Sequence, residues 1–73
     1  MDNNKNVVIV NNNRYLIIEK VEYDGRTFAY LINSSDEKDT DFVELKEDRV
    51  LEIQKDFFVS NIFPLFVDKF SGE

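Results

Sequence analysis

The chain has 73 residues, with 15 acidic residues against nine basic ones and no histidine or cysteine, for a net charge of −6. A chain this short supports one hydrophobic core, so we expect a single small domain over residues 1–73. The missing cysteines exclude disulfides and thiolate metal sites, and the missing histidines remove the commonest general base and transition-metal ligand. Most enzyme mechanisms are thereby excluded, and we expect a non-enzymatic protein without a cofactor.

The first half of the chain predicts three antiparallel strands joined by tight turns. The β-branched run 7–10 leads into residues 11–13, three asparagines, which tolerate left-handed turn geometry best after glycine. Residues 14–23 form the next predicted strand, and the Asp-Gly pair that follows them is a strong hairpin signal. The return strand 26–32 has apolar residues at odd and even positions, which indicates a central strand covered on both faces.

The second half predicts two more strands and a helix. Residues 33–40 are all polar or charged and predict an exposed loop, followed by a strand over 42–47, a turn at Asp48-Arg49 and a strand over 50–55. The Phe-rich segment after residue 56 lacks a period of two and favours a helix. Asn61 is its expected N-cap, with Pro64 in the first turn, and residues 56–60 form a separate turn.

These elements define an α+β fold: a curled antiparallel β-meander of about five strands with one C-terminal α-helix packed on it. The apolar positions of the helix cover an arc of about 200°, whereas one core-facing stripe needs about 100°. Two explanations of this excess stay open. The helix either lies across a curved sheet that wraps both its flanks, or it offers a surface for a homodimer or another partner. The residues of that surface are Phe58, Phe63, Phe66 and Phe70.

The order of these elements resembles a known protein family. The strand ending in Val-Glu-Tyr-Asp-Gly-Arg (21–26), the return strand Phe-Ala-Tyr-Leu (28–31), the acidic loop, the segment Phe-Val-Glu-Leu (42–45) and the apolar C-terminal segment carry the resemblance. Over most of its length the chain is similar to the small acidic bacterial proteins grouped as domain of unknown function 1292. The resemblance implies the fold class and a bacterial setting, and it implies no site residues.

The net negative charge is concentrated in residues 36–52, which hold eight acids against three bases. Outward side chains on a strand recur about every 6.6 Å, so these acids are expected to form a row of negative charge. Such a row repels nucleic-acid backbones and attracts a protein partner with a basic surface. The expected partner-binding residues are Glu37, Asp39, Asp41, Glu44 and Glu47. The alternative is that these acids serve only solubility.

The same segment holds carboxylates of the kind that catalytic and metal sites use. Paired carboxylates can act as acid and base only when they flank a cleft, for which this chain has little room. Counting from Asn33, the acids fall at the positions of a calcium-binding loop through Glu44, but Lys38 stands where the sharp turn requires glycine. We therefore expect no catalytic residue and no metal ligand.

Three function hypotheses follow, the last of which is an acidic calcium-responsive module. The first is a small acidic protein-binding module, carried by a phage or other mobile element, that inhibits a basic, nucleic-acid-handling host complex such as a defence effector. The second is a housekeeping structural or assembly protein that associates with itself through its Phe-rich helix. Residues 1–6 are polar and the apolar run 7–10 is short, so we expect no signal peptide, no membrane segment and a cytoplasmic location.

Overall fold

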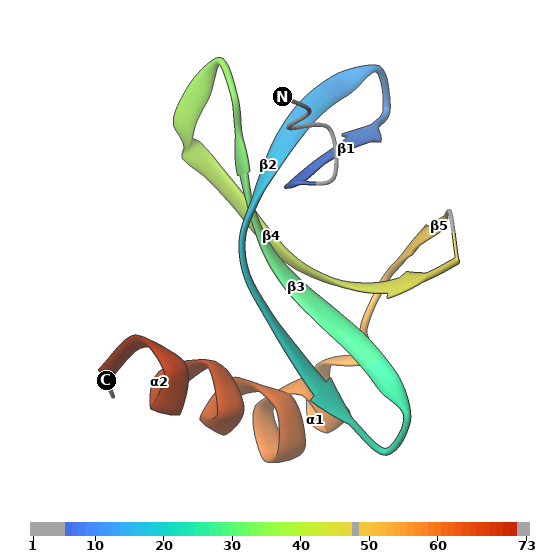
Figure 1. Cartoon of the computed structure of the whole chain (residues 1–73), viewed down its shortest axis with the longest axis vertical. Coiled ribbons are helices and arrows are strands. Elements are labelled where there is room, and N and C mark those ends of the chain that lie inside the picture. Colours follow the sequence, from blue (N-terminus) through green and yellow to red (C-terminus); the bar gives the residue numbers. More distant parts are fainter. Residues whose placement is uncertain (1–5, 48, 72–73) are drawn as a thin grey trace.

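The computed structural model describes residues 6–47 and 49–71, which form one curled sheet and a C-terminal helical segment (Figure 1). The strands are β1 (Val7–Val10), β2 (Asn13–Tyr23), β3 (Arg26–Asn33), β4 (Asp36–Lys46) and β5 (Arg49–Leu51). The helical segment consists of α1 (Lys55–Phe57), a π-helical turn (Phe58–Ile62) and α2 (Phe63–Ser71). The strands pair antiparallel in chain order, so the predicted α+β fold with a β-meander and one C-terminal helix is confirmed.

The first two hairpins turn where the sequence predicts. Asn11 and Asn12 have φ angles of 52° and 68°, and Asp24 and Gly25 have φ angles of 55° and 75°. Each pair forms a two-residue loop between strands, and positive φ at both positions is the geometry that matches the strand twist. Asn, Asp and Gly reach this region at low cost, which explains why these residues mark the turns.

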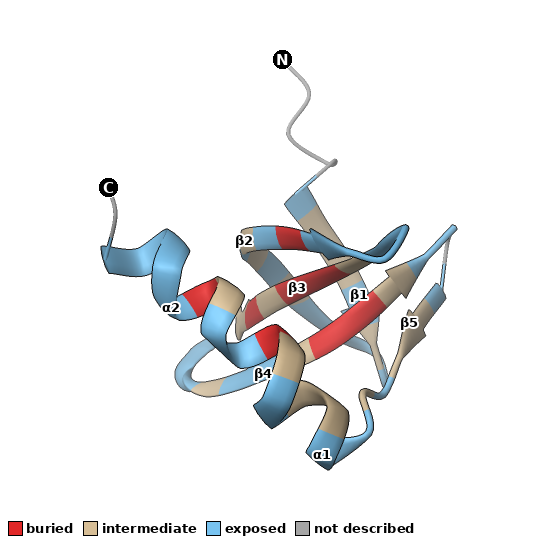
Figure 2. Cartoon of the chain, turned by 90° about the horizontal axis from the view of Figure 1, so that it is seen from below, coloured by how far each residue is buried: buried red, intermediate tan, exposed pale blue. Residues whose placement is uncertain are grey.

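A β-bulge bends β2. The register passes from Ile17 opposite Leu31 to Glu19 opposite Tyr30, which leaves Ile18 as an extra residue. A bulge bends its strand and increases the local twist. The sheet curls accordingly, and its two edge strands, β1 and β5, come to lie on the same side of the molecule, away from α2 (Figure 1, Figure 2).

The curled sheet is buried on both faces. On the helix face, Val21 and Phe28 of the sheet pack with Ile62 and Phe66 of the helical segment. On the opposite face, which we call the inner face, the buried residues are Ala29, Leu31 and Val43, with Val8, Tyr15, Ile17, Leu45 and Val50 packed around them. Buried positions therefore occur at odd and even residues of β3 (Figure 2), which confirms the predicted central strand.

The predicted loop 33–40 is wrong, because β4 already begins at Asp36. Short polar side chains close the hairpin instead: the Asn33 side-chain oxygen accepts the Ser35 backbone N–H at 2.7 Å, and that of Asp36 accepts the Lys38 N–H at 3.1 Å. The Ser34 N–H donates to the Arg14 carbonyl of the neighbouring strand at 2.9 Å. Polar composition indicated exposure correctly, but it did not exclude strand pairing at the end of a sheet.

The C-terminal boundaries also differ from the prediction. β5 overlaps the expected strand 50–55 only at residues 50 and 51 and includes Arg49 of the expected turn. The chain turns at Glu47, whose φ is 57°, and Asp48 of the expected turn lies outside the described residues. The helical segment starts at Lys55, so residues 56–60 are helical and Asn61 is no N-cap. A π-helical turn, closed by the Phe63 N–H on the Phe58 carbonyl, directly precedes Pro64. This wider turn lets a helix continue through a residue that lacks an N–H and crowds the preceding turn.

Candidate functional site

The predicted acidic residues do not form one row. Glu37, Asp39 and Asp41 alternate along the first half of β4, near the β3–β4 turn, and Asp41 pairs with Leu31 across the inner face. Glu47 lies after the other end of this 11-residue strand. We call Asp36, Glu37, Asp39 and Asp41 together the acidic hairpin. Its negative charge is local, and it does not extend along β4.

Within the acidic hairpin, Asp39 accepts hydrogen bonds from side chains of two other strands. Its Oδ2 accepts a hydrogen bond from the Tyr15 hydroxyl at 2.7 Å and another from the Asn33 amide at 3.1 Å. The bond to Asp39 raises the pKa of Tyr15 above its ordinary value of 10.0. Glu37 and Asp41 are exposed, and the Asp41 Oδ1 accepts the backbone N–H of Phe42 at 2.9 Å.

Glu44 is buried, so its predicted place in an exposed acidic row is wrong. The Arg26 guanidinium donates Nε to Oε2 at 3.0 Å and Nη2 to Oε1 at 2.9 Å. This two-point hydrogen bond lowers the pKa of Glu44 below its ordinary value of 4.5. The same guanidinium lies 4.7 Å from the ring centre of Phe57, so the pair holds the helical segment on the sheet.

The four phenylalanines of the predicted self-association surface separate into two groups. Phe66 is fully buried, and Phe58 is half-buried with its ring 4.9 Å from that of Phe42. The prediction is therefore wrong for Phe66, which serves the core. Phe63 and Phe70 are exposed, and sequence reasoning missed two valines beside them. We call the four exposed residues, which are between 45% and 55% exposed, the helix stripe: Val59, Phe63, Val67 and Phe70.

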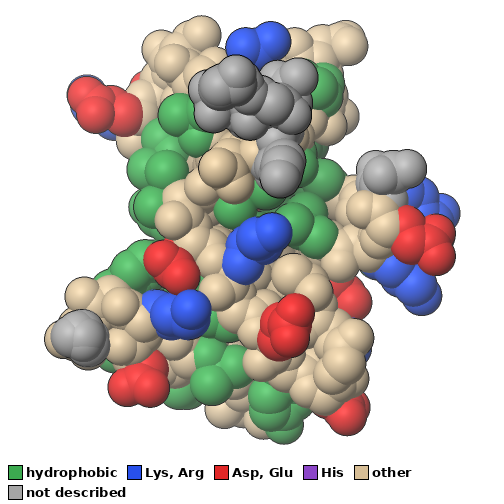
Figure 3. Space-filling view, viewed as in Figure 1, with side chains coloured by type: hydrophobic (Ala, Val, Ile, Leu, Met, Phe, Trp, Pro, Cys, Tyr) green, Lys and Arg blue, Asp and Glu red, His purple; other side chains and the backbone are tan. Residues whose placement is uncertain are grey.

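A second exposed apolar surface lies on the sheet, and sequence reasoning did not find it. Ile9, Leu16 and Ile18 are between 40% and 60% exposed, and we call them the β1–β2 patch. Near the end of α2, Lys69 lies 3.3 Å from the carboxylate of Glu19, the residue after Ile18. The signal was the unbroken apolar run 15–18, because successive strand residues point to opposite faces and one short helix cannot cover both. Figure 3 shows hydrophobic side chains at the surface over the strands as well as over the helix.

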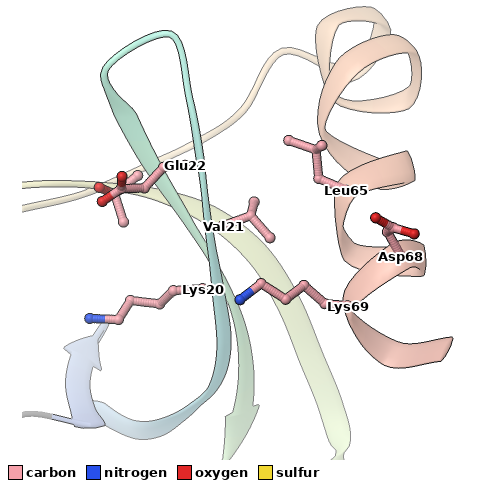
Figure 4. A pocket seen from close by; sticks show the side chains of 7 residues that line it. Lys20, Val21, Glu22, Leu65, Asp68 and Lys69 are labelled. Atoms are coloured by element: carbon pink, nitrogen blue, oxygen red, sulfur yellow. The ribbon is translucent and has the colours of Figure 1, made fainter. Parts of the chain in front are cut away.

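A cleft of about 610 Å³ separates β2 from α2 (Figure 4). Val21 and Leu65 face each other across it, and charges of both signs, including Glu22 and Asp68, lie around it. Its Lys69 is already paired with Glu19. Within residues 6–47 and 49–71, no three Asp or Glu side chains are grouped so that they could hold a metal ion.

Comparisons with protein-family models, curated proteins and solved structures give no match for this chain. The resemblance to domain of unknown function 1292 therefore stays a prediction. Across the part of the chain that the structure describes, every helix is too short or too polar to cross a membrane.

Proposed function

We propose that this chain is a non-enzymatic protein-binding module that contacts a partner through the β1–β2 patch, with the acidic hairpin beside it favouring a basic partner. The exposure of Ile9, Leu16 and Ile18 on one strand pair is the observation that supports this function most. Contiguous exposed apolar surface on a small domain typically marks a contact site. A central apolar area with a charged border is also the common anatomy of protein interfaces.

The acidic hairpin lies at the same end of the sheet as the patch, with Asp41 on the inner face and Leu16 on the other face. Tyr15 and Leu16 of β2 pair with Asn33 and Ile32 of β3, directly before the turn that leads into the acids. Exposed charges at a border act mainly on the rate and selectivity of association. A partner that normally holds a nucleic-acid backbone has the extended basic surface that such acids attract. The proposed partner is therefore a basic, nucleic-acid-handling protein complex, which the chain inhibits as a product of a phage or other mobile element.

The test is affinity capture by tagged protein from bacterial lysate at low and high salt, with mass spectrometry. A basic nucleic-acid-binding complex recovered at low salt and lost at high salt is the expected result. The double variant E37Q/D41N is expected to weaken capture several-fold by removing two exposed charges. The variant E22Q/D68N removes two exposed acids elsewhere and serves as the matched control. If the amount of captured partner changes neither with salt nor in E37Q/D41N, the electrostatic part of the proposal is contradicted.

The helix stripe supports a second candidate function, assembly of the chain with itself as a homodimer. Its four apolar side chains recur at intervals of four, four and three residues and so lie on one side of the helical segment. Sedimentation velocity over a wide concentration range measures this directly. A homodimer that F63E converts to a monomer is the expected result for this candidate. A monomer at every concentration contradicts it.

A further inference from the structure

We infer that the groove between the two edge strands, β1 and β5, binds an extended peptide that carries an acidic side chain. This site shares Ile9 with the β1–β2 patch, but Leu16 and Ile18 do not line it, and the inference goes beyond the proposed function. The groove has a volume of about 510 Å³, within the range of roughly 300 to 1,000 Å³ that is common for ligand sites.

The groove offers both elements that an added strand needs. Among the described strands, β1 pairs with β2 and β5 with β4, so each presents one open edge with unpaired backbone groups. The groove wall between these edges is apolar and is formed by inner-face residues such as Val8, Ile17, Leu45 and Val50. A peptide strand gains main-chain hydrogen bonds from an edge and inserts alternate side chains into an apolar wall. The open edge of β1, the longer of the two strands, is the proposed partner of the peptide backbone.

The charges of the groove select the chemistry of the peptide. Among the described residues, Lys20 and Arg49 line it against one acid, Glu47. This is a local excess of positive charge on a molecule whose net charge is −6. An apolar strand with one central Glu therefore fits the groove, whereas the same strand with Lys meets like charge. The rest of the surface, which is mainly acidic, disfavours the Glu peptide, so its binding reports on this groove.

The test uses two labelled peptides, blocked at both ends, of sequence Val-Thr-Glu-Thr-Val and Val-Thr-Lys-Thr-Val, in which both valines and the central residue share one face of the strand. They are titrated into the whole ¹⁵N-labelled chain. We expect the Glu peptide to shift backbone amide signals of β1 and β5, to slow hydrogen exchange in β1, and to bind about fivefold or more tightly than the Lys peptide. The variant K20E/R49E is expected to reverse this preference. The single variant R49E, at an exposed position, is expected to reduce it, and K55E, an exposed lysine outside the groove, leaves it unchanged.

Four results would overturn the inference. Two concern binding: neither peptide binds at millimolar concentration, or the signal shifts are confined to α2. The other two are a preference for the Glu peptide that survives both R49E and K20E/R49E, and shifts of β1 and β5 that appear when the protein concentration alone is raised. The last result would show that a second copy of the chain occupies the groove.

Discussion

Arg26 connects three parts of the chain through one side chain. It is the first residue of β3, and its guanidinium donates two hydrogen bonds to the Glu44 carboxylate of β4. The guanidinium also lies over the ring of Phe57 at the start of the helical segment. Because the pair is partly shielded from water, its attraction is screened less than that of a fully exposed pair. Glu44 is therefore a stabilising residue, although its charge alone suggested a binding role.

The lowered pKa of Glu44 predicts how stability depends on pH. A carboxyl whose pKa is lowered in the folded state contributes its full stability above the ordinary value of 4.5 and loses it as the pH falls through the lowered value. We expect E44Q to remove this part of the acid sensitivity. Urea midpoints measured at pH 7 and pH 3 test it, with the exposed-site variant E22Q as control. An E44Q protein that loses as much stability on acidification as the wild type contradicts this prediction.

The two groups of phenylalanines predict unequal costs of truncation. F66A removes a fully buried ring and is expected to cost about 3 to 5 kcal/mol, comparable to the whole stability of so small a domain. F70A removes a ring that is half exposed and is expected to cost clearly less. Circular dichroism during thermal unfolding measures both. Equal losses would show that Phe70 is buried in solution, as it would be in a dimer that uses the helix stripe.

At the scale of elements, the tight turns were predictable and the helix boundary was not. Asn-Asn and Asp-Gly act locally, because each residue's own backbone preference sets the turn. Pro64 gave a misleading start signal, since proline usually opens a helix and here follows a π-helical turn inside one. Residues 33–40 were misassigned because polar side chains can close a hairpin by the local hydrogen bonds of Asn33 and Asp36.

The Asp24-Gly25 turn predicts a strain effect without a steric clash. A methyl group at Gly25 would meet nothing within 4 Å, so G25A costs only the left-handed backbone, whose φ is +75°. The expected loss is about 1 to 2 kcal/mol in the free energy of unfolding. N12G, at a φ of 68°, is the matched change in the other hairpin and is expected to cost nothing. Chemical denaturation of both variants is the measurement, and a neutral G25A would contradict the turn geometry.

At the scale of the whole molecule, one helical segment covers only part of one face of the sheet. The sequence predicted the sheet, the helix and an apolar excess on that helix. It could not predict the β1–β2 patch, because the exposure of Leu16 depends on how far the helical segment extends across the sheet, which the packing of distant elements decides. Charge counting located the acidic hairpin but could not show that Arg26 neutralises Glu44. Ion pairs and packing between residues far apart in the sequence decide which of the predicted site residues are exposed to a partner.

Quantitative affinity capture with two matched variants tests the central claim, that the β1–β2 patch is the contact surface, most directly. I9S/L16S removes exposed apolar side chains from the patch, and V59S/V67S removes exposed apolar side chains from the helix stripe. Circular dichroism first establishes that both variants are folded. We predict that I9S/L16S captures about tenfold less partner than the wild type, while V59S/V67S captures as much as the wild type. Full capture by I9S/L16S would contradict the account.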